Sequence, residues 1–258
     1  MIVGLVLATA VALAAHRARA LSTSGAAAAI VTGTLAVAAG WSWAIILITY
    51  FTCATALSRY RSAEKEQRSS GVTEKRGARD AVQVFANGGA FAAMAVGYLV
   101  RPDPWWQALA AGALAAAAAD TWATEIGVLA RATPRAILGW QPVAVGTSGG
   151  VTAQGMLAAA AGAASTALIT WLVRWPAIAT VSAIVGGILG CVLDSIVGAW
   201  LQGRRWCASC GTATEQRFHR CGSATTAAGG VAWLDNDGVN AIATFGGALF
   251  GAGAASLF

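Results

Sequence analysis

Two carboxylates, Asp120 and Glu125, stand inside a long apolar stretch that runs from Trp105 to Ala130. A charged residue at the centre of a bilayer costs at least about 2.5–3.5 kcal/mol on insertion scales, so such residues mark functional sites. Their five-residue spacing separates them by about 140° around an ideal helix. The two side chains therefore serve different partners, or the helix that carries them is distorted.

Three other apolar segments also carry acidic and amide side chains at helical spacing. Residues three, four, seven or eight positions apart share one face of a helix, so each segment gathers its polar groups on one side. The groups are Asp80, Gln83 and Asn87 in the first segment, Asp194, Gly198 and Gln202 in the second, and Asp237, Asn240 and Thr244 in the third.

Carboxylates packed at one depth repel each other unless a proton or a cation neutralises them. A magnesium ion bound by one or two carboxylates and by substrate phosphates is a usual solution. For a single Asn or Gln we favour a hydrogen bond between helices, which is worth about 0.6 kcal/mol. For carboxylates on several helices we favour a metal or phosphate site.

The elements that must position these groups are transmembrane helices. Of the 258 residues, 57% are hydrophobic and 11% are charged, whereas soluble domains carry about 25% charged residues. We therefore expect an all-α, polytopic membrane protein with a single integral membrane domain over residues 1–258. Hydropathy and turn signals give about eight spans, at Ile2–Ala15, Ser24–Gly40, Trp41–Ser58, Ala81–Val100, Pro104–Ala130, Thr152–Val173, Pro176–Gln202 and Asp235–Phe258.

The basic residues support this count and give an orientation. With eight spans, 15 of the 17 Lys and Arg fall in loops on one side, and basic loops stay in the cytoplasm. Both termini then face outward, and the carboxylates lie on the cytoplasmic side. Because the cations lie in loops that flank the membrane, the net charge of +6 is not a sign of a nucleic-acid partner, and we expect none. Six tryptophans on the outer side are expected to form an aromatic belt: Trp41, Trp43, Trp105, Trp106, Trp171 and Trp175.

Two of the basic loops offer groups that bind phosphate. The glycine-rich run Gly146–Gly150 precedes a helix, and its free N–H groups and the helix dipole favour an anion. A merely flexible loop is the alternative. The loop from Arg59 to Arg79 is the most charged segment, and most of its cations fit a solvated loop near anionic lipid. Arg79, Lys65 and Arg76 are the candidates for holding phosphates.

A cytoplasmic loop at residues 203–230, between the last two spans, holds Cys207, Cys210, His219 and Cys221. Its placement argues against disulfides. Three thiolates and one imidazole suit a structural zinc ion, although the His219–Cys221 spacing is shorter than in common zinc fingers. A reduced, cysteine-rich loop without a metal is the alternative.

Together these residues resemble a family of membrane proteins that contains transmembrane protein 19 and the plant phytyl-phosphate kinase of tocopherol biosynthesis. The resemblance runs from about Lys65 to Asn240, and the Cys/His loop resembles that of bacterial members. The family is distantly similar to CTP-dependent polyprenol kinases. The matching motifs are Arg79–Gly89, Asp120–Gly127, Gly146–Thr152, Asp194–Gln202 and Asn236–Asn240.

The resemblance implies a CTP-dependent kinase that converts phytyl phosphate or another prenyl monophosphate to the diphosphate at the membrane, with Mg²⁺ as cofactor. Asp120, Asp194 and Asp237 would hold the magnesium, and Glu125 would be a further ligand or lie next to one. Groups for the nucleotide phosphates would be Lys65, Arg76, Arg79, Gly146, Thr147, Ser148, Gly149 and Gly150. The remaining motif residues would orient the ligands: Asp80, Gln83, Asn87, Thr121, Ser195, Gln202, Asn236 and Asn240.

Other activities stay open at this point. The same nucleotide site would serve a polyprenol kinase, or a cytidylyltransferase that forms a CDP-lipid. An ion-coupled transporter would also carry intramembrane carboxylates. A transporter, however, predicts polar sites near the midplane and a repeat between the two halves of the chain, and the sequence shows neither.

Overall fold

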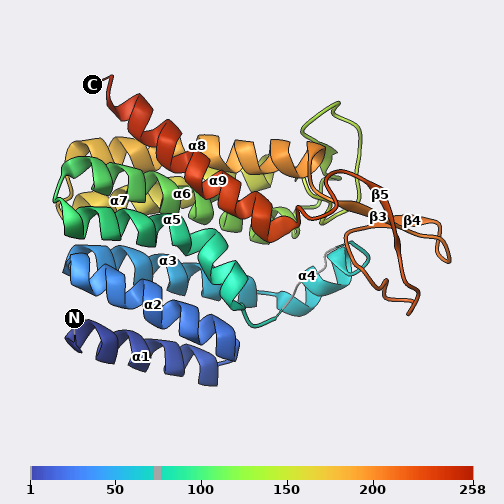
Figure 1. The fold of residues 1–258 in the computed structure, drawn as a ribbon. Helices are drawn as coiled ribbons and strands as arrows, with labels where there is room; N and C mark the ends of the chain where they lie inside the picture. The colour runs from blue at the N-terminus through green and yellow to red at the C-terminus, as the bar shows by residue number, and fades with distance from the viewer. Residues whose placement is uncertain (1, 73–76, 258) are drawn as a thin grey trace.

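A computed structural model describes residues 2–72 and 77–257 of the chain. Within these ranges the chain forms a bundle of eight long helices, and their bounds follow the expected spans closely (Figure 1). The largest differences are at two C-terminal ends, where helices stop at Gly127 and Ala255, short of the expected Ala130 and Phe258. The long helices are α1 (Ile2–Arg17), α2 (Thr23–Ala39), α3 (Trp41–Arg59), α5 (Ala81–Val100), α6 (Pro104–Gly127), α7 (Ala153–Leu172), α8 (Ala177–Trp200) and α9 (Asn236–Ala255).

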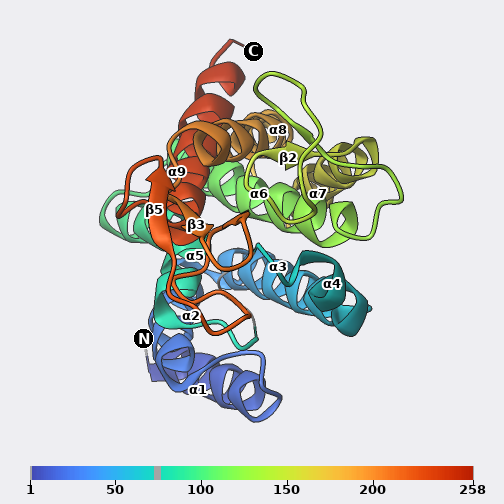
Figure 2. The same cartoon turned by 90° about the vertical axis from the view of Figure 1, so that its right-hand side faces the viewer.

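The remaining elements gather at one end of the bundle, while both chain termini lie at the other (Figures 1 and 2). A short helix, α4 (Ser62–Ser69), precedes α5. Strands β1 (Arg135–Ala136) and β2 (Gly150–Val151) pair antiparallel between α6 and α7. Strands β3 (Arg204–Cys207), β4 (Thr212–Thr214) and β5 (Thr226–Gly229) form a sheet of order β4-β3-β5 between α8 and α9. We call residues 203–230 the ribbon module.

Five of the described helices are long and apolar enough to cross a membrane: α3, α5, α7, α8 and α9. The helices α1 and α2 are apolar but have only 16 and 17 residues. The helix α6 is not among the five, because its sequence is dominated by alanine and contains Gln107, Asp120 and Glu125. The all-α membrane class is thus confirmed. Five described helices are long and apolar enough to cross a membrane, fewer than the eight spans expected.

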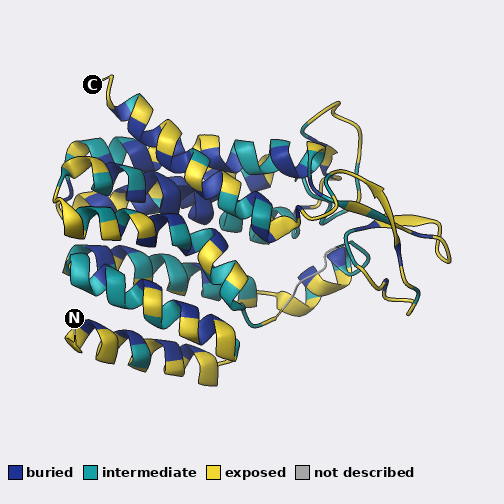
Figure 3. Ribbon diagram, in the orientation of Figure 1, coloured by how far each residue is buried: buried dark blue, intermediate teal, exposed yellow. Residues whose placement is uncertain are grey.

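The core of the bundle is built from small residues around α6, which packs against α3, α5, α7, α8 and α9. Ala108 and the run from 110 to 119 are buried, and the exposed residues of the other helices face outward (Figure 3). A Cβ added at Gly247 would lie 2.6 Å from Ala116 Cβ and 2.9 Å from the Gly186 carbonyl oxygen. Small residues let helix backbones approach this closely in lipid. The same approach brings the polar ends of α6, α8 and α9 together.

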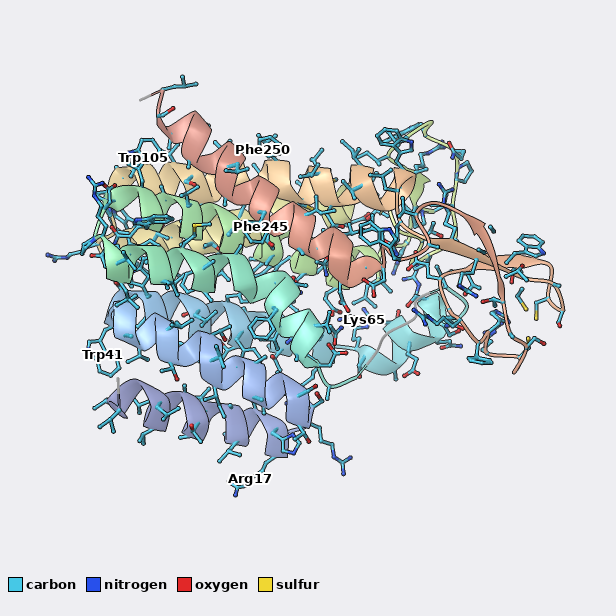
Figure 4. The ribbon with its side chains drawn as sticks, in the orientation of Figure 1. Arg17, Trp41, Lys65, Trp105, Phe245 and Phe250 are labelled. Carbon is cyan, nitrogen blue, oxygen red and sulfur yellow. The ribbon has the colours of Figure 1, made fainter. Side chains whose placement is uncertain are left out.

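The expected tryptophan belt is correct only in part. Trp41 and Trp105 project at the end of the bundle that carries the termini (Figure 4), and Trp171 is also exposed. Trp43 and Trp175, however, are buried and contact each other with ring centroids 4.8 Å apart and ring planes tilted by 59°. Trp43 also contacts Phe91 edge-on. These two rings fill the bundle core, because the helices there carry alanines too small to fill it alone.

Candidate functional site

A cavity of about 680 Å³ opens at the end of the bundle that carries α4 and the ribbon module. This volume is within the range of small-molecule sites, about 300–1,000 Å³. The cavity brings together residues from six long helices, α3 and α5 to α9, and from the segments between them. The sequence-predicted residues that line it are Lys65, Arg79, Gln83, Asn87, Asp120, Thr121, Glu125, Gly146, Thr147, Ser148, Gly149, Gly150, Asp194, Ser195, Gln202, Asn236, Asp237 and Asn240.

Of the described residues predicted for this site, Asp80 does not line the cavity. Asp80 is the N-cap of α5, where its carboxylate accepts a hydrogen bond from the Gln83 N–H at 2.9 Å. The Gln83 side chain accepts from the Asp80 N–H in return, which completes a capping box. Asp80 therefore sets where α5 begins and where its polar face points. Arg76 lies outside the described residues.

Two carboxylates meet at the base of the cavity, Asp120 of α6 and Asp194 of α8. Their carboxyl groups are close enough to interact directly, and among the described residues the Oδ2 oxygen of Asp194 is buried without a hydrogen-bond partner. Asp237, in the first turn of α9, is buried with 3% of its surface exposed. Facing carboxyl oxygens with an unsatisfied buried acceptor fit a divalent cation, since hard cations take oxygen ligands. Asp120 and Asp194 therefore offer suitable oxygen ligands for Mg²⁺, whereas among the described residues Asp237 does not join them in a group of three at metal-ligand distances.

Glu125 lines the same cavity but belongs to a different network. Its carboxylate pairs with the Lys65 ammonium of α4 at 2.6 Å and accepts a hydrogen bond from the Ser58 hydroxyl at 2.6 Å. Lys65 also donates to the Leu57 carbonyl oxygen, and only 8% of its surface is exposed. Figure 4 shows Lys65 at this end of the bundle. Glu125 therefore fixes a buried cation at the cavity wall, and Asp120 faces the other carboxylates.

Arg79 extends this network toward α3. Its guanidinium donates to the Thr55 hydroxyl at 3.0 Å and to the Ser58 hydroxyl at 3.1 Å, and it lies over the Phe51 ring. The Ser58 hydroxyl thus accepts from Arg79 and donates to Glu125. These contacts leave a fixed positive charge beside the cavity, where it can meet a phosphate.

The glycine-rich loop packs directly on α8. Gly149 has φ +74°, and a Cβ there would lie 2.4 Å from Ala199 Cβ and 2.6 Å from the Ser195 carbonyl oxygen. Only glycine fits both this backbone conformation and this contact. The Ser148 N–H and hydroxyl both donate to one carboxylate oxygen of Glu215, at 3.1 and 2.6 Å. The loop therefore binds a carboxylate group in the way expected for an anion.

The amides have partly structural roles. Asn87 donates to the Gln83 carbonyl oxygen one turn earlier, so its side-chain oxygen remains for the cavity. Gln202 is buried, and its side-chain oxygen Oε1 has no hydrogen-bond partner. Buried polar atoms are rarely left unsatisfied. This oxygen is therefore a further candidate for contact with a bound ligand.

The described cavity wall carries charges of both signs, with seven cationic and seven acidic side chains. Sequence reasoning missed several of them, together with Ser58, because their proximity depends on how the ribbon module folds back over the bundle. Their only signal in the sequence is a high density of charge in the loops beside the motifs. The cations are Arg19, Arg59, Lys65, Arg79, Arg204, Arg205 and Arg217, and the acids are Glu66, Asp120, Glu125, Asp194, Glu215, Asp235 and Asp237.

The four Cys/His side chains lie in the ribbon module and do not line the cavity. One ligand atom from each of Cys207, Cys210, His219 and Cys221 lies within 4.8 Å of the others. Hydrogen bonds from the Ser223 hydroxyl and from His219 lower the pKa of Cys221 to about 5. The pKa of Cys210 is raised to about 11, mainly by the contact of Cys210 with Cys221. The cluster therefore holds a ready thiolate outside the cavity.

Comparisons with known proteins agree with this architecture. A family model described as "Integral membrane protein DUF92" matches residues 6–248. An uncharacterized membrane protein of Synechocystis is 29% identical over 218 residues, which cover 83% of this chain and 74% of that protein. Protein PGR of Arabidopsis thaliana is 28% identical over 223 residues, covering 76% and 75%. No solved structure matches the chain.

Proposed function

The chain belongs to the family described as integral membrane protein DUF92, and on that premise we propose that it is a phosphotransferase acting at the membrane surface. The proposed reaction transfers the γ-phosphoryl group of CTP to an isoprenoid monophosphate, which gives the diphosphate and CDP. One observation carries the proposal: a single cavity at one end of a membrane bundle joins carboxylates of three helices, fixed cations and an anion-binding loop. This combination suits a reaction between two phosphorylated substrates.

The proposed reaction requires positioning of the substrates and neutralisation of their charge more than it requires a strong base. A phosphate oxygen of the isoprenoid monophosphate is already ionised and attacks the γ-phosphorus, while the bond from that phosphorus to the β-phosphate oxygen breaks and CDP leaves. The protein must hold two polyanions in line and offset charge on the transferred group. Magnesium bound to the cavity would supply part of that neutralisation.

The described residues divide into matching roles under this proposal. Asp120, Asp194 and Asp237 would hold the magnesium ion, since their carboxylates reach the cavity from α6, α8 and α9. Lys65 and Arg79 would contact phosphate oxygens, and each is held in place by the hydrogen bonds that it donates to groups of α3 or α6. The glycine-rich loop would receive the nucleotide phosphates through its N–H groups.

The orientation of the bundle follows from the same proposal. The cavity end carries the basic loops, so it would face the cytoplasm, where CTP is available. Both termini would then lie outside, at the opposite end of the bundle (Figure 1). The isoprenoid chain would remain between helices in the inner leaflet while its phosphate enters the cavity.

The test is product analysis with protein purified in detergent, supplied with CTP, Mg²⁺ and a panel of prenyl monophosphates and prenols. We expect a prenyl diphosphate and CDP. A CDP-lipid with pyrophosphate would instead identify a cytidylyltransferase, and a monophosphate formed from a prenol would identify a polyprenol kinase. If no nucleotide is consumed with any acceptor, while the reconstituted protein moves ions across liposomes, the kinase proposal is wrong.

A further inference from the structure

The ribbon module has almost no apolar interior among its described residues. Its two large apolar side chains, Trp206 and Phe218, are 43% and 73% exposed. The buried side chains are small or polar: Cys207, Thr214, His219 and Thr225. A segment this small rarely holds its shape without a disulfide, a metal or another covalent staple. Something other than hydrophobic burial must therefore hold the strands and turns of the module together.

The cluster of thiols and imidazole has the dimensions of a metal site. The Cys207 and Cys221 sulfurs are 3.7 Å apart, and His219 Nδ1 lies 3.2 Å from the Cys221 sulfur. A tetrahedral zinc ion with Zn–S bonds of about 2.3 Å places two sulfurs about 3.8 Å apart. A disulfide would bring them to about 2.05 Å, and the cysteines are free.

We propose that Cys207, Cys210, His219 and Cys221 bind one zinc ion in a closed, tetrahedral, structural site. Three sulfur ligands favour zinc over the hard cations that suit the carboxylate cavity. All four coordination positions come from the protein, so this ion has no open position for substrate, as in structural zinc sites. The inference concerns a site separate from the cavity and does not depend on the proposed kinase activity.

The site would stabilise the part of the module that closes the cavity. Thr225, four residues after Cys221, accepts a hydrogen bond from the Arg205 guanidinium at 2.7 Å and donates to the Gln216 carbonyl oxygen at 2.6 Å. Arg205 lines the cavity, and Glu215 contacts the glycine-rich loop through Ser148. Metal binding at the cluster would therefore position charged groups of the module over the cavity.

The direct test is the metal content of the purified full-length chain, measured by mass spectrometry after removal of loosely bound ions. We expect about one zinc ion per chain in the wild-type protein, as in a closed structural site. Cys207→Ser and His219→Ala should lose most of it. Cys53→Ser, which changes a thiol of α3 outside the cluster, should retain it.

A second measurement covers the case in which a variant fails to fold. Cobalt exchanged into the wild-type protein should give the absorption of tetrahedral thiolate coordination. Trypsin should cut after the exposed Arg217 and Arg220 several-fold faster once a chelator has removed the metal. Wild-type protein that contains no zinc and takes up no cobalt would overturn the proposal. So would bound iron in place of zinc, or full zinc content in both cluster variants.

Discussion

At the scale of single residues, the two carboxylates of α6 have distinct partners although they share one cavity. Asp120 meets Asp194, and Glu125 meets Lys65 and Ser58. The angle of about 140° expected from their spacing on a helix accounts for this division. The helix α6 needs no distortion, because Asp120 and Glu125 line different parts of the same cavity wall.

The Lys65–Glu125 pair should be strongly coupled in stability. The side chains are only 10% and 21% exposed, and removing one partner of a buried pair costs about 3–5 kcal/mol because the other charge is left uncompensated. We expect Lys65→Met or Glu125→Gln alone to cost about 3 kcal/mol, at the lower end of that range. The double variant should recover part of the loss. Unfolding of all four proteins in detergent measures this, and strictly additive losses would contradict the pairing.

How far the sequence predicts single residues depends on how local their partners are. Most of the acidic and amide positions found at helical spacing do line one cavity. Asp80 was predicted to orient a ligand but caps α5 outside the cavity lining, because an N-cap and a ligand have the same sequence pattern until the start of the helix is known. Ser58 and Glu215 were missed because their partners are 67 positions away in the chain. Helical periodicity carries no signal at that distance.

At the scale of elements, the glycine-rich loop depends on its contact with α8. Gly149→Ala would add about 1–2 kcal/mol of backbone strain at positive φ and a Cβ 2.4 Å from Ala199 Cβ. We expect the loop to shift and the KM for CTP to rise about tenfold, the equivalent of about 1.4 kcal/mol. Kinetics of the purified variant measure this.

Two variants control for that experiment. Gly253→Ala adds a Cβ in α9 with no atom within 4 Å, and it should leave the KM unchanged. Ala199→Gly in the Gly149→Ala background removes the shortest of the three close contacts and should restore part of the affinity. A Gly149→Ala protein with the wild-type KM would show that the loop does not hold the nucleotide.

The Glu215 contact gives a prediction of opposite sign. Its carboxylate accepts from the Ser148 N–H, the kind of donor that a nucleotide phosphate would need. Glu215→Gln removes the charge that competes with the nucleotide, so the KM for CTP should fall several-fold. Glu66→Gln removes a charge from the same cavity wall at an exposed position, where solvent screening makes the effect small. A higher KM in Glu215→Gln would mean that Glu215 supports nucleotide binding.

At the scale of the whole molecule, the membrane class and the positions of the long helices could be predicted from hydropathy and turn residues. The arrangement of the ribbon module could not be predicted, because its strands have only three or four residues and its two large apolar side chains are exposed. The burial of Trp43 and Trp175 was also missed. A tryptophan near a helix end has the same sequence signature whether it faces lipid or a neighbouring helix.

The bundle as a whole explains why costly charges persist in a membrane protein. Small residues at the crossing of α6, α8 and α9 let three backbones meet, and the polar ends of these helices then enclose one cavity. The basic loops and the ribbon module cover that cavity from the water side. Under the proposed function, the apolar half of the bundle would hold the isoprenoid chain and the charged half would hold the phosphates.

The most direct test of the central claim is transfer of label from CTP carrying radioactive phosphorus at the γ position. Wild-type protein with Mg²⁺ and a prenyl monophosphate should move the label into the prenyl diphosphate, and label at the α position should stay in CDP. Asp194→Asn and Asp120→Asn should lower kcat at least about 100-fold, as expected for loss of electrostatic stabilisation. Asp103→Asn, at the α6 N-cap on the opposite end, should not. Full transfer by the Asp194→Asn protein, or no transfer by the wild type, would contradict the account.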